Sequence, residues 1–192
     1  EVTWANFWRI FLAESGGEDA TTSSQKNRLG NHLGIWDMGI YFTLDATEVH
    51  TYYQHFFEDR SGLEDFQNGT DGLWGLAFDN LPIPFITNFL YEYLKTTHQS
   101  GDAHDVDGDV LGGRDSYYHH GQYANGWTHL NHVLGNSFFS TVGEDEELRI
   151  ANNRMKIHHL GLSGAITERI GYKMLLSYAR YYPAYASVSL YD

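Results

Sequence analysis

This 192-residue chain lacks cysteine and long apolar runs, and it has few basic residues. The absence of cysteine excludes a disulfide framework and a thiolate metal site. Lysine and arginine number 12 against 25 acidic residues, and the net charge of −13 argues against nucleic-acid phosphate as a partner. No stretch of about 18 or more apolar residues occurs, which excludes a transmembrane helix but not strands that cross a membrane.

Aromatic side chains are abundant, at 16% of the chain with 14 tyrosines and 5 tryptophans. Such rings serve in strand cores, in the interfacial girdles of membrane proteins and as stacking platforms for sugars. Several of them gather near the ends of expected strands, as Trp4 and Trp8 do, and as Tyr178, Tyr181 and Tyr182 do. That placement is typical of rings at the level of lipid headgroups.

Two segments alternate between apolar and polar residues with a period of two, which predicts β-strands over 33–45 and 170–182. Each segment is long enough for the roughly 9 to 11 residues that a tilted strand needs to cross a hydrocarbon layer. The apolar rows are Trp36, Met38, Ile40, Phe42 and Leu44 in the first segment, and Ile170, Tyr172, Met174, Leu176 and Tyr178 in the second. Further strands are expected at 2–12, 48–58, 72–79, 85–97, 150–167 and 185–191, and no helix is expected.

These patterns predict an all-β fold, namely an antiparallel transmembrane β-barrel or the C-terminal part of a larger one, with about eight strands in this chain. Residues 1–192 are expected to form a single barrel region. Residues 98–140 lack clear alternation and are predicted to form a long loop that folds into the lumen or over the barrel mouth. A soluble β-sandwich with apolar inner faces is the alternative architecture.

The second half of this loop is dense in rings and hydrogen-bonding groups, which is the composition of a carbohydrate-binding surface. Flat aromatic faces hold the CH surfaces of sugars, while charged and amide groups bind their hydroxyls. The candidate carbohydrate-binding residues are Arg114, Asp115, Tyr117, Tyr118, His119, Tyr123 and Trp127. The alternative for each of them is packing inside the lumen, with Arg114 and Asp115 paired to each other or to charges of the barrel wall.

Four stretches of the chain, which occur in consistent order, resemble the Wzi-type capsule assembly family of outer-membrane barrels. They are LGIWD at 33–37, FFEDRSGL at 56–63, GRDSYYHHGQYANGWT at 113–128 followed by VLGN at 133–136, and NNRMKIHHLGL at 152–162. The resemblance implies a bacterial outer-membrane barrel that associates with capsular or other exopolysaccharide and helps to anchor or assemble it at the cell surface. It implies no catalytic residue and no cofactor.

Members of the family are longer than this chain, and the match resembles their C-terminal portion. The resemblance therefore implies that further N-terminal strands, supplied by the same parent protein, complete the barrel. Outer-membrane lipid is the other expected partner. The barrel must be closed there, because an open sheet edge in lipid leaves backbone groups unsatisfied. The alternative functions are a secreted β-sandwich enzyme that acts on glycans and a passive diffusion porin.

Glu58, Asp59 and Arg60 end an expected strand and are candidate charged residues of the lumen. A hydrolase would use Glu58 with Asp59 or Glu92 as an acid/base pair, but spacing in the sequence does not test the separation of two carboxylates. A charged strand end that faces water, or an ion pair in the lumen, is the favoured interpretation.

Asp105, Asp107 and Asp109 flank a glycine turn and form a weak candidate site for calcium, the one cofactor that any pattern suggests. The bidentate glutamate expected at the twelfth position of such a loop is absent, because Ser116 stands there, so a solvated acidic loop tip is favoured. In an extended strand the pairs at 119–120 and 158–159 point to opposite sides, so adjacent histidines do not chelate one metal.

Overall fold

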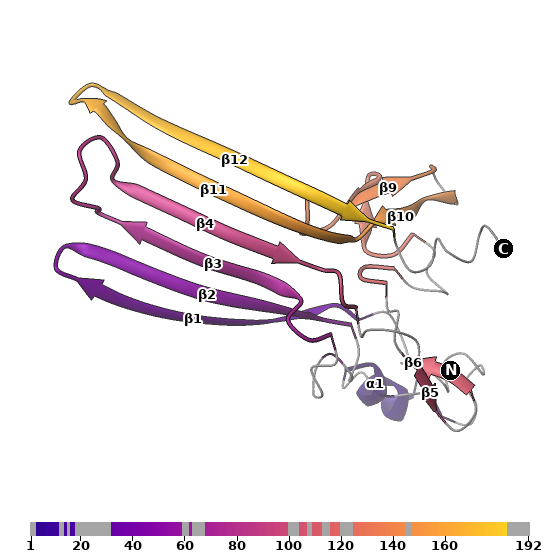
Figure 1. The fold of residues 1–192 in the computed structure, drawn as a ribbon. Coiled ribbons are helices and arrows are strands. Elements are labelled where there is room, and N and C mark those ends of the chain that lie inside the picture. Colours follow the sequence, from indigo (N-terminus) through magenta and orange to yellow (C-terminus); the bar gives the residue numbers. More distant parts are fainter. Residues whose placement is uncertain are drawn as a thin grey trace.

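A computed structural model gives the fold, and it describes residues 3–11, 14, 16–17, 32–58, 62, 68–99, 104–106, 109–112, 116–119, 125–144 and 147–183. This part of the chain is mostly β-structure in antiparallel sheets (Figure 1). Six long strands form one sheet in the order β1-β2-β3-β4-β11-β12. They are β1 (Gly34–Leu44), β2 (Thr47–Phe57), β3 (Gly72–Asp79), β4 (Asn88–Lys95), β11 (Arg154–Thr167) and β12 (Ile170–Tyr182).

The predicted strands at 33–45, 48–58, 72–79, 85–97 and 170–182 are confirmed as β1, β2, β3, β4 and β12. β4 begins later than expected, because Phe85 has a positive φ of 71° in a turn closed by the bridge between Ile83 and Ile86. The segment 150–167 is also confirmed, although Asn153 separates β10 (Arg149–Asn152) from β11. The strand expected at 185–191 lies outside the described residues.

The opening segment is a helix, α1 (Trp4–Phe11), so the strand predicted over 2–12 is wrong. The hydroxyl of Thr3 caps the helix by accepting a hydrogen bond from the backbone N–H of Asn6 at 3.1 Å. Trp4, Phe7, Trp8 and Phe11 recur at helical spacing, and their rings contact one another edge to face or stacked. Trp4 and Trp8 fit both a period of two and a helical turn, which explains the wrong prediction. Among the described residues, no helix is long and apolar enough to cross a membrane.

The interval 98–140 contains short strands where one loop was expected. β5 (His104–Val106) pairs with β6 (Asp109–Gly112), and β7 (Thr128–His129) pairs with β8 (His132–Val133). A third ladder joins β9 (Ser140–Val142) to β10. Leu130 and Asn131 join β7 to β8 with positive φ at both positions, as a tight two-residue hairpin turn requires. Such short ladders give too few residues for an alternation to be recognised.

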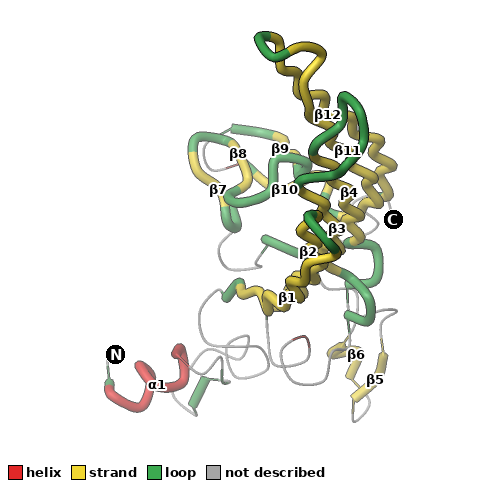
Figure 2. Tube along the Cα trace, turned by 90° about the vertical axis from the view of Figure 1, so that its left-hand side faces the viewer, coloured by secondary structure: helices red, strands yellow, loops and turns green. Residues whose placement is uncertain are grey.

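The long sheet has two chemically different faces. We call the face on which β7–β10 lie the inner face and the opposite one the outer face (Figure 2). Residues paired across antiparallel strands point to the same face, so the register gives continuous rows. One outer row runs Ile40, Thr51, Leu76, Tyr91, Leu160, Leu176, and the next runs Phe42, Val49, Phe78, Phe89, Leu162, Met174.

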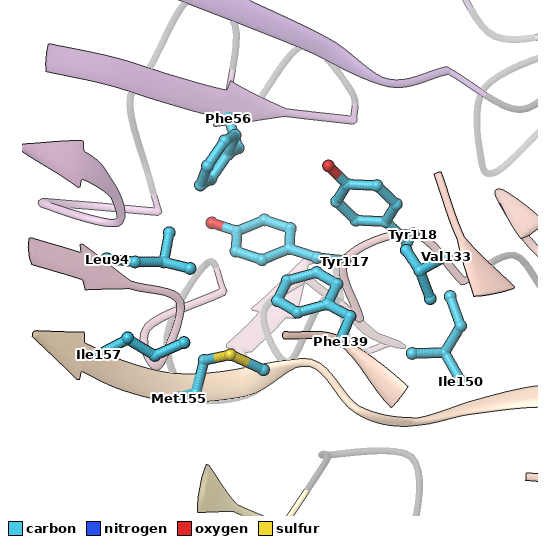
Figure 3. Packing of buried hydrophobic residues seen from close by; sticks show 9 residues of the cluster. All are labelled: Phe56, Leu94, Tyr117, Tyr118, Val133, Phe139, Ile150, Met155 and Ile157. Carbon is cyan, nitrogen blue, oxygen red and sulfur yellow. The ribbon is translucent and has the colours of Figure 1, made fainter. Parts of the chain in front are cut away.

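The hydrophobic core lies on the inner face, at the end of the sheet where the long connections are (Figure 3). The sheet contributes Phe56, Leu94, Met155 and Ile157, and the short elements contribute Tyr117, Tyr118, Val133, Phe139 and Ile150. The rest of the inner face is not filled by this cluster. The core therefore fixes the small hairpins over one end of the sheet and leaves a polar surface beside them.

Candidate functional site

A row of polar side chains crosses the inner face of the sheet from β2 to β12. The register places Tyr52, Gly75, Glu92, His159 and Ser177 side by side on five neighbouring strands. The Tyr52 hydroxyl donates a hydrogen bond to Glu92 Oε1, and His159 Nδ1 lies 2.7 Å from Ser177 Oγ. The row thus presents a phenol, a carboxylate, an imidazole and a hydroxyl along one line.

Gly75 makes the Tyr52–Glu92 contact possible. The Tyr52 ring lies over Gly75, where a Cβ atom would overlap it, and so reaches across β3 to β4. A second ring lies over a glycine of a neighbouring strand in the same way, because a Cβ atom at Gly39 on β1 would lie 2.9 Å from Nε2 of His50 on β2. Glycine in a strand interior weakens the strand, so both positions indicate that a ring must lie close to the backbone.

The neighbouring inner rows extend this surface. Gln54 Nε2 donates a hydrogen bond of 3.1 Å to Asp37 Oδ2. The rings of Tyr41 and His50 are stacked with centroids 3.8 Å apart, and the centroids of His50 and Tyr52 are 4.8 Å apart. Flat rings thus stand next to carboxylate and amide groups, which is the combination that binds both the CH faces and the hydroxyls of sugars.

Two adjoining cavities lie on this surface. An open one of about 560 Å³ is lined by polar and aromatic side chains and by a smaller apolar group. The first are Asp37, Tyr41, His50, Tyr52, Gln54 and Glu92, and the second are Leu73, Ala77 and Leu90. A second one of about 250 Å³ lies where residues 135–138 cover the sheet, and it shares Gln54, Leu73 and Glu92 with the first. The larger volume is within the range of small-molecule sites, about 300–1,000 Å³.

Four of the seven predicted carbohydrate-binding residues lie in the described part of the chain. Tyr117 and Tyr118 are buried, at 2% and 3% exposure, and belong to the core, while His119 and Trp127 are half-buried. Tyr118 also lines the smaller cavity. Tyr117 and Tyr118 therefore hold the segment against the sheet, and sugar binding by this group stays a prediction. Arg114, Asp115 and Tyr123 lie outside the described residues.

The anchor of this segment is a buried carboxylate, that of Asp71, which sequence reasoning missed. Asp71 Oδ2 accepts hydrogen bonds from the backbone N–H groups of His98 and Gln99, both at 2.9 Å, and from the Tyr117 hydroxyl at 3.2 Å. Lys95 Nζ lies 3.8 Å from Oδ1. Burial raises the pKa of Asp71, and these donors and the lysine oppose that rise.

Amide side chains complete this anchor. Asn153 Nδ2 donates to Ser116 Oγ at 2.9 Å and to the carbonyl oxygen of Tyr117 at 2.8 Å. Asn68 Nδ2 donates to the Tyr117 hydroxyl at 3.0 Å. Burial, followed by the charge of Asp71, raises the pKa of Tyr117 well above its ordinary value, so this hydroxyl stays protonated and remains a donor. The only sequence signal was the Gly-Thr-Asp-Gly composition of 69–72, which marks a turn.

The charged candidates have structural contacts where they are described. Glu58 Oε1 accepts a hydrogen bond from the backbone N–H of Tyr118, so it helps to fix the segment, while Asp59 and Arg60 lie outside the described residues. His158 lies 2.7 Å from the Tyr91 hydroxyl on the outer face, and His159 bonds on the inner face. The prediction that these adjacent histidines point to opposite sides is confirmed.

The acidic candidates for calcium fall in and around β5 and β6. Asp105 pairs with Val110, and Asp109 pairs with Val106, while Asp107 lies outside the described residues. In the part of the chain that the structure describes, no group of three or more histidine, aspartate or glutamate residues is arranged to hold a metal ion. Calcium binding by this loop stays a prediction.

These features define an antiparallel β-protein whose long sheet carries exposed apolar side chains on the outer face of its edge strands, and a partly covered row of polar side chains on the inner face. Residues 1–151 match the family described as "Capsule assembly protein Wzi", so the chain belongs to the Wzi capsule assembly family. The match confirms the family resemblance seen in the stretches at 33–37, 56–63, 113–128 and 133–136, while the stretch at 152–162 lies beyond the matched residues. The family implies a cell-envelope setting. The family is defined by capsule assembly and not by a catalysed reaction. No curated protein and no solved structure matches the chain.

Proposed function

We propose that this chain is part of an outer-membrane β-barrel that associates with capsular or other exopolysaccharide and helps to anchor or assemble it at the cell surface. The single observation that carries the proposal is the contrast between the two faces of the sheet, in a chain that belongs to a capsule assembly family. The outer face is the lipid-facing wall, and the inner face borders the lumen.

The exposed apolar side chains of the outer face support the proposal that this face contacts lipid. Ile40 and Leu176 are each 64% exposed and lie on the two edge strands of the sheet. The outer row that runs from Phe42 to Met174 is apolar on all six strands, although Val49 within it is buried, at 2% exposure. Leaving an exposed apolar side chain in water costs about 1.5–3 kcal/mol relative to burial. A soluble β-sandwich would cover these rows with a second sheet, and none lies against them in the described residues.

The open edges of the sheet support the proposal that further strands complete the barrel. Among the described strands, β1 and β12 each have a partner on one side only, and each has 11 or more residues along the other edge. Unpaired backbone groups in hydrocarbon cost several kcal/mol each, so a lipid-embedded sheet must close. We assign the missing partners of β1 and β12 to other strands of the same parent protein.

The side chains of the inner face support the proposal that this face binds the polysaccharide. Its rings, carboxylates and amide around the larger cavity offer both stacking surfaces and hydrogen-bond partners, and residues 135–138 cover one side of the adjoining cavity. A covered lumen favours binding over the free diffusion of a porin. The polysaccharide would therefore contact Tyr52, Gln54, Glu92 and His159, together with the covering segment.

The test is binding of the purified capsular polysaccharide by the full-length protein in detergent. Glu92→Gln keeps the shape of the side chain and removes the charge, and we expect it to weaken binding about tenfold, as the loss of a charged hydrogen bond does. Tyr91→Phe is the control, because it removes one hydroxyl from the adjacent residue on the opposite face. Equal binding by all three proteins, or weaker binding in Tyr91→Phe alone, would contradict the inner face as the site.

A further inference from the structure

A row of basic side chains crosses the outer face at the end of the sheet where the long connections lie. Lys95 on β4 pairs with Lys156 on β11, and Lys156 pairs with Arg180 on β12. The three residues thus stand next to one another on three neighbouring strands, with Cα atoms about 4.8 Å apart from strand to strand. They form what we call the basic row.

Nothing in the described protein neutralises the greater part of this charge. Like charges directly opposite each other on paired strands destabilise a sheet, and the basic row contains two such pairs. Asp71 lies 3.8 Å from Lys95, but in the described part of the chain neither Lys156 nor Arg180 is paired with a carboxylate. Both lie instead over the ring of Tyr182, at 5.9 and 5.2 Å from its centroid.

The chemistry changes in order along the outer face from this row toward the hairpin turns. Two residues further along the strands come Tyr93, His158 and Tyr178, and two further still come Tyr91, Leu160 and Leu176. Four residues of a strand span about 13 Å, so the basic row lies that far from the first apolar side chains of β11 and β12. None of the outward-facing residues of β4, β11 and β12 in this stretch is acidic.

This order is that of a membrane surface, with charge at the headgroups, aromatic rings at the interface and aliphatic side chains in the hydrocarbon. Long basic side chains at such a level extend toward the headgroups. The two-residue turns at 45–46 and 168–169 lie at the opposite end of the sheet. In outer-membrane sheets the short turns are periplasmic and the long connections extracellular, which assigns the basic row to the outer leaflet.

We propose that Lys95, Lys156 and Arg180 bind the phosphate groups of an anionic membrane lipid of the outer leaflet. The inference rests on the proposed function, because it requires the outer face to contact lipid. A phosphorylated headgroup supplies the missing negative charge, and the adjacent Tyr178 and Tyr182 rings pack beside it. In a chain with a net charge of −13, such a row also counteracts repulsion between the protein and an anionic membrane surface.

The experiment measures binding of lipid A, which carries two phosphates, and of phosphatidylcholine to the full-length protein in detergent micelles by native mass spectrometry. We expect the double variant Lys156→Gln and Arg180→Gln to bind lipid A about 30-fold more weakly, since each basic side chain at a membrane surface contributes about fivefold. Phosphatidylcholine binding should not change. Lys173→Gln is the control, because it removes the same charge from the opposite face of β12 and should bind lipid A like the parent protein.

Each other outcome has one meaning. If the double variant inserts into vesicles and binds lipid A as tightly as the parent protein does, the proposal is overturned. If it loses affinity for anionic capsular polysaccharide and keeps its affinity for lipid A, the row is a polysaccharide site and the proposal is again overturned. If the parent protein fails to insert into vesicles at all, the membrane-spanning function itself fails. The heat-dependent shift in gel mobility shows whether the variants remain folded.

Discussion

Removing the carboxylate of Asp71 should release the segment that carries Tyr117 and Tyr118 from the sheet. Asp71 is fully buried and accepts hydrogen bonds from the backbone N–H groups of His98 and Gln99 and from the Tyr117 hydroxyl. The substitution Asp71→Ala leaves these three donors without their acceptor in a site closed to water. Each buried unsatisfied donor costs about 1–3 kcal/mol, and water that enters the new space recovers part of that sum.

We therefore expect Asp71→Ala to lower the local stability of this anchor by about 3–5 kcal/mol, the range seen when one partner of a buried charged network is removed. Asp71→Asn should cost less, because the amide oxygen still accepts one of the hydrogen bonds. The matched control is Asp79→Ala, which removes an exposed carboxylate from the far end of β3, the strand that begins directly after Asp71. Its effect should stay within about 0.5 kcal/mol, as is usual for surface substitutions.

Hydrogen exchange of the Gln99 backbone amide measures this anchor directly. In the parent protein the amide donates to Asp71 Oδ2 at 2.9 Å and should exchange only when the anchor opens. Asp71→Ala should accelerate its exchange by about two to four orders of magnitude, which corresponds to about 3–5 kcal/mol, while amides in the middle of β11 remain protected. Unchanged exchange at Gln99 would refute the reasoning, and equal acceleration throughout the sheet would show that Asp71 stabilises the whole fold and not this anchor.

Three further predictions concern Gly75 in the candidate site and the half-buried residues His119 and Trp127. Gly75→Ala should displace the Tyr52 ring from Glu92 and lower the free energy of unfolding by about 1–3 kcal/mol. Thermal unfolding of the double variant with Tyr52→Phe should show that the two losses of stability do not add. Additive losses would mean that Gly75 does not act through the Tyr52 ring. Burial lowers the pKa of His119 below its ordinary value of 6.5, so the stability that its neutral form provides is complete above pH 6.5 and is lost as the pH falls below it. Urea unfolding between pH 5 and 8 should show the free energy of unfolding rising with pH in the parent protein, and rising less in His119→Gln. Trp127→Ala should weaken polysaccharide binding while the heat-dependent gel shift remains, and unchanged binding would remove Trp127 from the site.

The long strands were predictable because their pattern is dictated by two environments. On one face β1 carries Trp36, Met38, Ile40 and Phe42, and on the other it carries mostly polar or small residues, with Ile35 as an exception. β12 repeats the arrangement, with Leu175 as its exception. Only a strand with chemically different sides requires such alternation. The bounds of β3 and β12 agree residue for residue with those expected from the sequence.

The inner-face site was not predictable in the same way, because it depends on register. Tyr52, Glu92 and His159 come from three strands that are separated by 40 and 67 residues of chain, and only strand pairing brings them into one row. The predictions for the loop were limited for the same reason, because they used only the composition of the loop itself. Tyr117 and Tyr118 have the composition of a sugar platform, but their burial is decided by Asp71 and by core residues that lie far away in the sequence.

The measurement that tests the central claim most directly is a spin-label scan of β1 in the full-length protein reconstituted in lipid. These 192 residues contain no cysteine, so single cysteines at Ile40, Tyr41, Phe42 and Thr43 can be labelled individually once any cysteine elsewhere in the full-length protein is replaced by serine. The account predicts that labels at Ile40 and Phe42 collide mainly with oxygen, which concentrates in hydrocarbon, and that labels at Tyr41 and Thr43 collide mainly with a water-soluble relaxation agent. Protection of Ile40 and Phe42 from both agents, or equal exposure of all four positions to water, would contradict a lipid-facing outer face.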